Sequence, residues 1–348
     1  MFLLTLRDLQ YRAMRFALVI VGTTIVFALL LLMDGLAAHF YREPLHSVRA
    51  IGADAWILPK GVSGPFTAAV TMDPSVAAAV TGVDRADPLI AARSSLWISG
   101  SPREVILIGY VSGGIVEPPL VAGAEPISGN QVVLDETTGL RPGAHVRIGS
   151  GEFAVSGLSR DTTLLAGVPL GFMGLADAQA QVFGGRDVAT AVLTRGHPTQ
   201  APPGFQIMSN SQVAEDARHP LERAVSSLNL VRTLLWIVSA MIIGGVVYLS
   251  SMERRRDFAV LKAIGGSTRA LLSGLAAQGV FVAAAAAGLA AVLQLLLAPT
   301  FPLKVEVTPQ ALLQLPALAL AVSLLASAAG MRRVARIDPA LAFSGPGG

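Results

Sequence analysis

The sequence contains no cysteine at all. Disulfide bonds and thiolate metal sites are therefore excluded, and cysteine usage gives no information on the redox compartment. Charged residues are also scarce, because Asp, Glu, Lys and Arg make up only 14% of the 348 residues. Soluble domains carry roughly a quarter charged residues, and the mean hydropathy of this chain is +0.60. The composition therefore indicates a membrane protein.

Several chemical motifs are missing as well. The sequence has no GxxxxGK[ST] phosphate loop, no GxSxG elbow and no HExxH helix, and its five histidines are scattered without ligand spacing. Asp135 and Glu136 are adjacent, so on a strand they would point to opposite faces, and we expect them to be solvated charges at a turn. The sequence thus predicts no catalytic residue, no metal site and no cofactor of its own, and enzymatic activity is not expected.

Long apolar runs are what the sequence does contain. Each is about 18 residues or longer, enough to cross a ~30 Å hydrocarbon core as a helix. They predict transmembrane helices at residues 16–38, 230–250, 271–298 and 311–330. A cleaved signal peptide is the alternative for the first run, but its apolar stretch is longer than the ~7–15 residues typical of such a peptide. Asp34 directly follows the apolar stretch Phe16–Met33 within this segment, and we expect it at the outer water interface.

The distribution of Lys and Arg predicts the orientation. Three of these residues precede the first run, five lie between the second and third, and three follow the fourth. Residues 39–226 instead hold 13 basic and 17 acidic side chains, a net charge of −4. The positive-inside bias places both termini in the cytoplasm and the large domain outside. The basic character of the chain then reflects membrane orientation, and a nucleic-acid partner is not expected.

The outer segment, residues 39–210, shows the pattern of an α+β domain inserted between transmembrane helices 1 and 2. Its best hairpin is His145–Ser159, where apolar residues alternate on both sides of Gly149-Ser150-Gly151. Helices are predicted at Pro74–Val80 and Leu175–Phe183. Further strands are predicted at 53–59, 94–99, 104–110, 131–136, 189–194 and 205–209.

The remaining segments connect these parts. Residues 1–15 predict an amphipathic helix on the inner leaflet, and residues 211–229 predict a stalk helix that continues into the second span, bent at Pro220. Residues 299–310 form an outer loop, and residues 331–348 a cytoplasmic tail. The polar glutamines of the spans, Gln278, Gln294 and Gln314, are expected to bond between helices.

Residues 251–270 predict a cytoplasmic helix between the second and third spans. Phe258, Leu261 and Ile264 recur at three-residue spacing and give one apolar face, and Gly265 or Gly266 can end the helix. Two interpretations are open on these grounds. The helix rests on anionic lipid through its arginines, or its apolar face docks into a groove of a cytoplasmic partner.

The same segment resembles the cytoplasmic segment of FtsX-like ABC transporter permeases of the MacB type. The family pattern is a basic run, an acidic residue, an apolar core and a small residue before the next span. This resemblance implies that an ATPase docks on nine residues, which are Arg254, Arg255, Arg256, Asp257, Phe258, Leu261, Lys262, Ile264 and Gly265. The tail Arg332–Phe343 and the outer segments GADAWILP and VVLDETTGLRPGAHVRIGSGEFAVSGLS are also similar to that family. Many relatives carry a glutamate where this chain has Gln278.

The resemblance implies a homodimeric permease in the bacterial plasma membrane, with ATP bound by a separate cytoplasmic ABC ATPase. ATP hydrolysis would move an amphiphilic, lipid or peptide-like substrate through conformational change of the outer domain, which has the MacB core-like fold. Membrane lipid and an extracytoplasmic protein are further partners. Three alternatives stay open: a regulator that transports nothing and transmits force to an outer partner such as a cell-wall hydrolase, a small-solute uptake permease, and a membrane-anchored binding protein without an ATPase.

Overall fold

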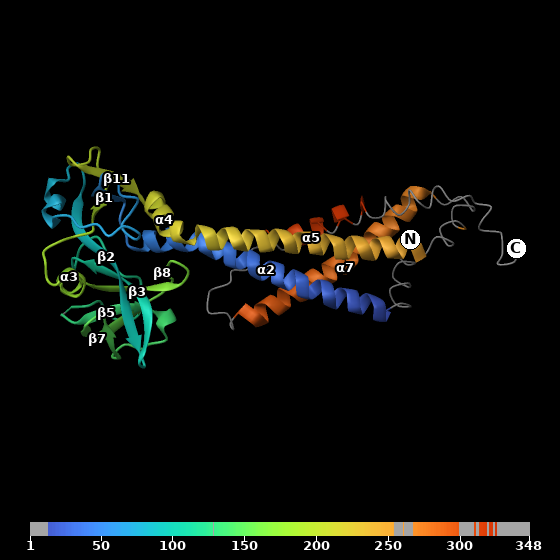
Figure 1. Cartoon of the computed structure of the whole chain (residues 1–348), viewed down its shortest axis with the longest axis horizontal. Coiled ribbons are helices and arrows are strands. Elements are labelled where there is room, and N and C mark those ends of the chain that lie inside the picture. Colours follow the sequence, from blue (N-terminus) through green and yellow to red (C-terminus); the bar gives the residue numbers. More distant parts are fainter. Residues whose placement is uncertain are drawn as a thin grey trace. The chain divides into compact units, whose positions relative to one another are not determined.

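The chain divides into two compact units in a computed structural model (Figure 1). The structure describes residues 13–127, 129–253 and 267–298, together with 260, 310, 313–318, 320–322 and 324–325. Unit 1 comprises residues 1–38 and 226–348, and unit 2 comprises residues 39–225. Unit 1 is helical where it is described, and unit 2 combines a mixed β-sheet with short helices.

Three long helices supply most of the described part of unit 1. They are α2 (Ala13–Ala50), α5 (Glu222–Glu253) and α7 (Thr268–Leu297), and α2 and α5 each continue into residues of unit 2. Among the described residues, three helical segments are long and apolar enough to cross a membrane. The fourth predicted span is described only in part, with helix at residues 313–318, so four spans stay a prediction.

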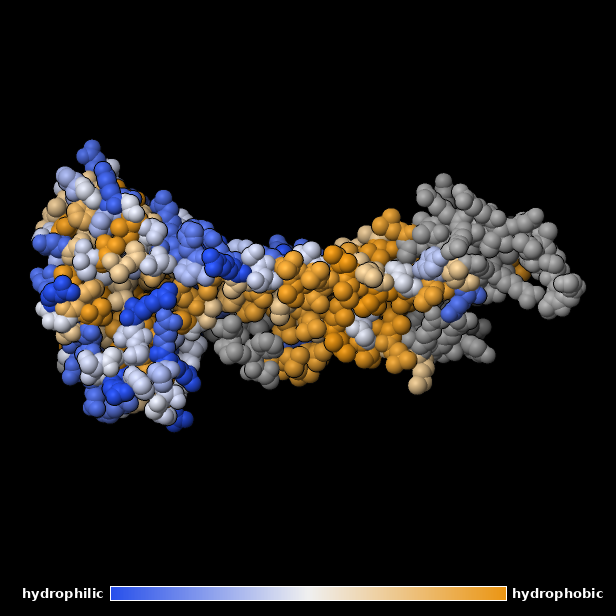
Figure 2. Space-filling model, in the orientation of Figure 1, coloured by the Kyte–Doolittle hydropathy of each residue, from blue (hydrophilic) through white to orange (hydrophobic). Residues whose placement is uncertain are grey.

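Small side chains line the packing between these helices. Alanines of α7 recur every three or four residues and pack with Phe27 and Leu31 of α2 and Ile243 of α5. Alanine lets two backbones approach closely, which is how helices associate without a hydrophobic driving force in lipid. Figure 2 shows apolar residues gathered on the outer surface of these helices as well. On α5 such residues include Leu230, Leu234 and Met241, which is the pattern of a lipid-facing or partner-facing surface.

Unit 2 contains one sheet of eleven strands. The strands are β1 (Ala55–Pro59), β2 (Arg85–Ile98), β3 (Ser101–Tyr110), β4 (Leu120–Gly123), β5 (Gln131–Asp135), β6 (His145–Ile148), β7 (Gly151–Ser159), β8 (Thr163–Leu164), β9 (Val168–Gly174), β10 (Ala191–Arg195) and β11 (Phe205–Ser209). The helices of unit 2 are η1 (Pro74–Ala79), η2 (Glu136–Thr138), α3 (Leu175–Phe183), α4 (Asn210–Arg218) and η3 (His219–Leu221).

Six of the strands close into a ring. In order of pairing they are β2, β3, β9, β5, β7 and β6, and β6 pairs back onto β2. The β3–β9 and β5–β7 pairs are parallel and the other four are antiparallel. The side chains on the inner face of these strands fill the ring, and they include Val105, Leu107, Leu134 and Phe153. Closure leaves these six strands without an open edge among themselves, which protects them from pairing with other chains.

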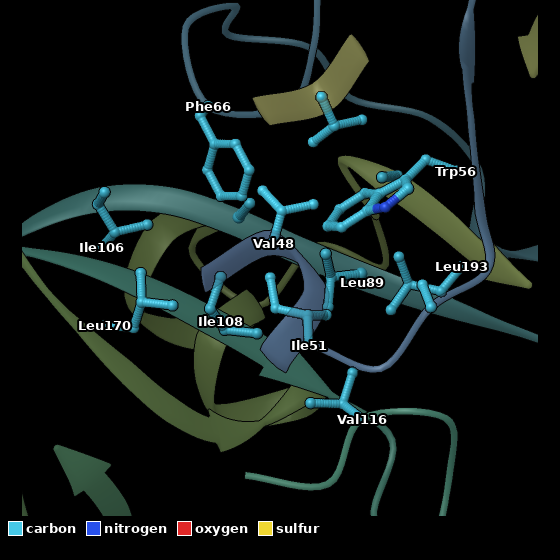
Figure 3. Close-up of a cluster of buried hydrophobic side chains, with 14 of the residues drawn as sticks. Val48, Ile51, Trp56, Phe66, Leu89, Ile106, Ile108, Val116, Leu170 and Leu193 are labelled. Carbon is cyan, nitrogen blue, oxygen red and sulfur yellow. The ribbon is translucent and has the colours of Figure 1, made fainter. Parts of the chain in front are cut away.

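The first half of β2 leaves this ring and carries a second set of strands, in the order β2, β10, β1, β11. A second core lies here and includes residues of the opposite face of β3, Ile106 and Ile108 (Figure 3). Val48 of α2 and Ile51, the residue after the helix end, belong to this core, and both side chains are fully buried. The last turns of α2, which belong to unit 2, therefore end at the packed interior of that unit.

Most predicted elements of the outer segment are confirmed. The β6–β7 hairpin forms with Val146 opposite Phe153 and with Gly149 at φ 56° in the turn. Helix α3 covers Leu175–Phe183 as expected, whereas Pro74–Ala79 is a 3₁₀-helix. Strand β2 begins at Arg85, nine residues before the predicted strand. Strands β4, β8 and β9 were not predicted.

The predicted stalk helix is interrupted. Ser209 and Gln212 form a capping box that starts α4, and a 3₁₀-turn containing Pro220 separates α4 from α5. Proline lacks the N–H that an α-helix interior requires, so a break at this position has a direct physical cause. The stalk is thus two helices with a turn between them.

Candidate functional site

The nine residues predicted to dock an ATPase, Arg254 to Gly265, lie outside the described residues. Helix α5 ends at Glu253 and α7 begins at Thr268 on either side of them. Their role stays a prediction. The site that the structure does describe lies in unit 2, where the last turns of α2 meet the loop between β7 and β9.

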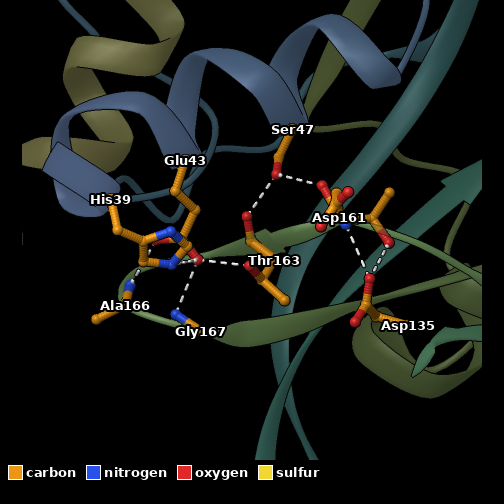
Figure 4. Close-up of polar contacts among 9 residues, drawn as sticks. His39, Glu43, Ser47, Asp135, Asp161, Thr163, Ala166 and Gly167 are labelled. Atoms are coloured by element: carbon orange, nitrogen blue, oxygen red, sulfur yellow. Dashed lines mark hydrogen bonds and ion pairs between the residues drawn. The ribbon is translucent and has the colours of Figure 1, made fainter. Parts of the chain in front are cut away.

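Glu43 is the centre of this site (Figure 4). Its side chain is only 2% exposed. Oε1 accepts hydrogen bonds from the Thr163 hydroxyl at 2.6 Å and from the Gly167 N–H at 2.8 Å. Oε2 accepts from the Ala166 N–H at 3.1 Å. A buried carboxylate needs such donors, because an unsatisfied buried charge is very costly.

The loop that Glu43 binds has an unusual backbone. Asp161, Leu165 and Ala166 have φ values of 56°, 54° and 67°, in the left-handed region, and Gly167 follows at 91°. Non-glycine residues rarely adopt this conformation, and it persists only where surrounding contacts impose it. The carboxylate of Glu43 satisfies two N–H groups of this segment. Glu43 therefore stabilises a strained loop conformation.

Two other residues of α2 lie on the same face. Ser47, fully buried, donates to the backbone oxygen of Thr163 at 2.5 Å and lies 3.4 Å from that of Asp161. His39 lies one turn before Glu43, with its Nε2 3.9 Å from Oε1. The spacing i, i+4, i+8 places all three side chains along one helix face. The helix thus contacts the loop through Glu43 and Ser47, one turn apart, and His39 lies beside Glu43.

A second buried carboxylate holds the start of the same loop. Asp135 is fully buried, and its Oδ2 accepts from the Thr162 N–H at 2.8 Å and from the Thr162 hydroxyl at 2.9 Å. Its Oδ1 accepts from the Thr137 N–H at 2.9 Å and caps η2. The expectation that Asp135 is a solvated turn charge is wrong, because the side chain is buried. Its partner Thr162 is distant in sequence, so the neighbouring residues do not reveal this contact. Glu136 is partly exposed and pairs with Arg160 at 2.8 Å.

The chemistry of this site is structural. Its donors are backbone amides and hydroxyls that are already bonded, and no positioned nucleophile and base occur together among the residues in Figure 4. In the described part of the chain, no group of three or more His, Asp or Glu residues is placed to hold a metal ion. The arrangement can attach a helix to a loop and transmit displacement between them.

Polar contacts also join the helices of unit 1. Arg232 of α5 donates to Asp34 of α2 at 3.0 Å, and the Asp34 side chain is only 15% exposed. Gln278 of α7 donates to Ser250 of α5 at 3.2 Å, and Gln294 donates to the backbone oxygen of Leu31 at 3.3 Å. The expectation that the glutamines of the spans bond between helices is confirmed for Gln278 and Gln294, and the Gln314 side chain is exposed. The ion pair was not foreseen, because its two residues are 198 positions apart.

Comparison with known proteins gives consistent matches. Residues 229–339 match the family described as FtsX-like permease C-terminal. An uncharacterized ABC transporter permease of Mycobacterium tuberculosis (strain H37Rv) is 40% identical, and the alignment covers 98% of this chain and 99% of that protein. A second such permease of that strain is 37% identical over the same shares. The putative hemin transport system permease protein HrtB of Staphylococcus epidermidis is 20% identical, over 97% of this chain and 98% of that protein.

Two solved structures are similar to part of the chain. The periplasmic region of MacB from Actinobacillus actinomycetemcomitans gives a TM-score of 0.36 at 15% identity, covering 50% of this chain and 96% of that one. The extracellular domain of the noncanonic ABC-type transporter YknZ from Gram-positive bacteria gives 0.33 at 11% identity, covering 45% and 99%.

Proposed function

Because this chain belongs to the FtsX-like ABC transporter permeases, we propose that it converts ATP hydrolysis by a separate ATPase into movement of its extracytoplasmic domain, unit 2. That movement acts on an amphiphilic, lipid or peptide-like substrate. One relative is named for transport of hemin, an amphiphile, which supports this substrate class. ATP is bound by the partner subunit, and this chain supplies the membrane path and the moving domain.

The attachment of α2 within unit 2 carries the mechanical part of the proposal. Val48 and Ile51 are packed in the core of unit 2, and Glu43 and Ser47 hold the 161–167 loop through buried hydrogen bonds. Breaking such bonds costs about 1–3 kcal/mol for each group left unsatisfied. Displacement of α2 therefore carries the loop with it more readily than it breaks the contact. This favours transmission of movement through α2 into the sheet.

The remaining features of the proposal follow the family. Two copies of the chain form a homodimer, each with one ATPase, in the bacterial plasma membrane. Both termini and residues 251–270 lie in the cytoplasm, where Phe258, Leu261 and Ile264 fill a groove of the ATPase. The arginines Arg254 to Arg256 meet acidic residues around that groove, and charge complementarity sets the rate and orientation of docking.

Replacement of Leu261 by Asp tests the docking. A charge in the apolar groove is expected to abolish co-purification of the ATPase, while the yield and melting temperature of the permease stay unchanged. Val121→Asp is the matched control, because Val121 is an exposed apolar residue of β4 in unit 2. Undiminished co-purification of the ATPase with the Leu261 variant would contradict the docking role.

Transport is tested separately from docking. The intact complex is reconstituted in liposomes, and ATP hydrolysis is measured with and without candidate amphiphiles. Stimulation of hydrolysis together with movement of the amphiphile between leaflets or out of the membrane supports transport. Hydrolysis that responds only to an added outer protein would instead support the force-transmitting regulator.

A further inference from the structure

A pocket of about 400 Å³ lies in unit 2, away from the Glu43 site. It is lined by the 65–71 segment, by residues 91–93 of β2, by the end of α3 and by Thr190. We propose that this pocket binds the alkyl chain of an amphiphile whose anionic head group contacts Arg93. Its place in transport rests on the proposed function, because it would be a substrate site on the moving domain. The binding itself does not depend on that function.

The lining of the pocket is mainly apolar. Small side chains, among them Ala68, Ala69 and Ala92, leave the space open, and Phe66 and Phe183 provide ring surfaces. Ligand sites in proteins are typically clefts of roughly 300–1,000 Å³ with apolar walls and a few placed polar groups. The volume suits one medium-length chain rather than a folded polypeptide. Transfer of such a chain from water to these walls is favourable.

Two hydroxyl groups in the walls, those of Thr67 and Thr190, are already bonded, which favours an alkyl chain over a peptide. The Thr67 hydroxyl donates to Asp216, and the Thr190 oxygen accepts from the Ala91 N–H at 2.7 Å. A peptide segment brings an N–H and a C=O with every residue, and these would lose their bonds to water without replacement. A hydrocarbon chain has no such groups. The mainly apolar walls therefore favour an occupant without hydrogen-bonding groups along its length.

Arg93 gives the pocket its charge. Among the described residues that line the pocket it alone carries a charge. It pairs with Glu104 at 3.2 Å, and the two side chains are 47% and 46% exposed. Exposed pairs of this kind contribute only ~0–1 kcal/mol, so an anionic head group can compete for the guanidinium. Arginine binds phosphate and carboxylate groups through paired hydrogen bonds. The expected head group is therefore an anion of this type.

The wall segment is held in place at both ends. At one end the buried carboxylate of Asp216, on α4, accepts from the Phe66 N–H at 3.1 Å, and Gly64 lies so close that a Cβ there would be 2.2 Å from Asp216 Cγ. At the other end Met72 and Ala189 exchange backbone hydrogen bonds at 2.8 and 2.9 Å. The pocket is thus pre-formed, which lowers the entropic cost of binding. It is also connected to α4, the helix that precedes α5.

A fluorescence experiment can test the site on the full-length protein. The chain has three tryptophans, and the Trp56 ring lies 6.1 Å from the ring of Phe66 (Figure 3). The variant Trp97→Phe/Trp236→Phe leaves Trp56 as the only reporter. Dodecyl phosphate brominated at the chain end is titrated into this protein in lipid nanodiscs, without ATPase or ATP. Bromine quenches tryptophan at short range, so a chain in the pocket quenches Trp56.

We expect saturable quenching that Ala92→Phe abolishes by filling the pocket, while Ala124→Phe, on an exposed loop, leaves it intact. Arg93→Gln should weaken binding about tenfold through loss of a charge-assisted contact. Glu104→Gln should strengthen binding, because it frees the guanidinium. Unchanged melting temperatures of the variants show that folding is not the cause.

Three results would overturn the proposal. The first is quenching that is insensitive to Ala92→Phe. The second is equal binding of a brominated alkyl ammonium, which has a cationic head group. The third is displacement of the probe by an apolar peptide as readily as by unbrominated dodecyl phosphate. Failure here leaves the proposed permease function untouched, because that function is tested by ATPase co-purification with the Leu261 variant. Conversely, binding at this pocket would survive loss of ATPase docking.

Discussion

Two buried carboxylates, Glu43 and Asp135, hold the loop of residues 161–167 in a conformation that its own sequence does not favour. Asp135 bonds its first part through Thr162, and Glu43 bonds its second part through Ala166 and Gly167. Sequence reasoning could not identify either role. An acid at a turn and an acid after a membrane span are both ordinarily solvated, and their partners lie tens of residues away. Long-range partners decide whether a charge is buried.

Glu43→Gln is the first prediction at the scale of single residues. The amide can keep the bonds from Thr163 and Gly167, but its NH₂ group would face the N–H of Ala166 where Oε2 now accepts. We expect the free energy of unfolding to fall by about 1–3 kcal/mol. Thermal unfolding of the purified protein measures this as a lower melting temperature. His46→Gln, on the exposed face of the same helix, is the control, and equal stability of the two variants would contradict the role of Glu43.

Tyr110→Phe gives the opposite expectation. Tyr110 is 2% exposed, and its hydroxyl has no hydrogen-bond partner among the described residues. Burial raises the pKa of this hydroxyl, with a further contribution from Glu125, so it stays protonated and neutral. Removal of an unbonded buried hydroxyl should leave stability unchanged or raise it by up to about 1 kcal/mol. A clear drop in melting temperature would show that the hydroxyl has a bonded role.

Elements with regular local patterns could be predicted, and those defined by tertiary packing could not. The β6–β7 hairpin and α3 carry their own periodicity and turn residues. Strand β9 contains Pro169, Gly171 and Gly174, which lower strand propensity. Gly171 sits in tight packing, since a Cβ there would lie 3.2 Å from a methyl group of Leu134. Glycine and proline are uncommon in strand interiors, so the residues that fit the packing here do not identify β9 as a strand in the sequence.

The Asp34–Arg232 pair leads to a prediction at the scale of helices. It joins α2 to α5 at 3.0 Å, and Asp34 is largely buried. Removal of one partner leaves an uncompensated charge, which costs about 3–5 kcal/mol when fully buried and less here because Arg232 is 38% exposed. Asp34→Asn and Arg232→Gln should each lower the melting temperature of the protein in detergent or nanodiscs.

The double variant Asp34→Asn/Arg232→Gln completes a mutant cycle for this pair. If the two charges stabilise each other, the double variant loses less stability than the sum of the single changes. Thr233→Val, an exposed position on the same helix, controls for changes at the surface of α5. Additive losses would mean that the ion pair does not couple the helices.

At the scale of the whole chain, hydropathy predicted how the chain is divided. Three membrane-length helices are found where apolar runs were read, and the segment between the first two is a separate unit with an α+β fold. The closed ring of six strands could not be inferred, because it depends on pairing between strands such as β6 and β2 that are far apart in sequence. Local pattern defines elements, and non-local pairing decides how they close.

The absence of cysteine allows a direct test of the predicted topology. Any introduced cysteine is the only thiol of the chain, so labelling with a membrane-impermeant maleimide reports one position at a time. Ser101→Cys lies at an exposed position beside the β2–β3 turn, and Val260→Cys replaces a side chain that is 51% exposed within the 251–270 segment. The positive-inside bias predicts that these two positions lie on opposite sides of the membrane.

In right-side-out vesicles the cysteine at position 101 should be labelled and the one at position 260 should not, and in inverted vesicles the pattern should reverse. The unmodified chain is the blank, and labelling of both positions from one side would contradict the topology and, with it, contact between the 251–270 segment and a cytoplasmic ATPase.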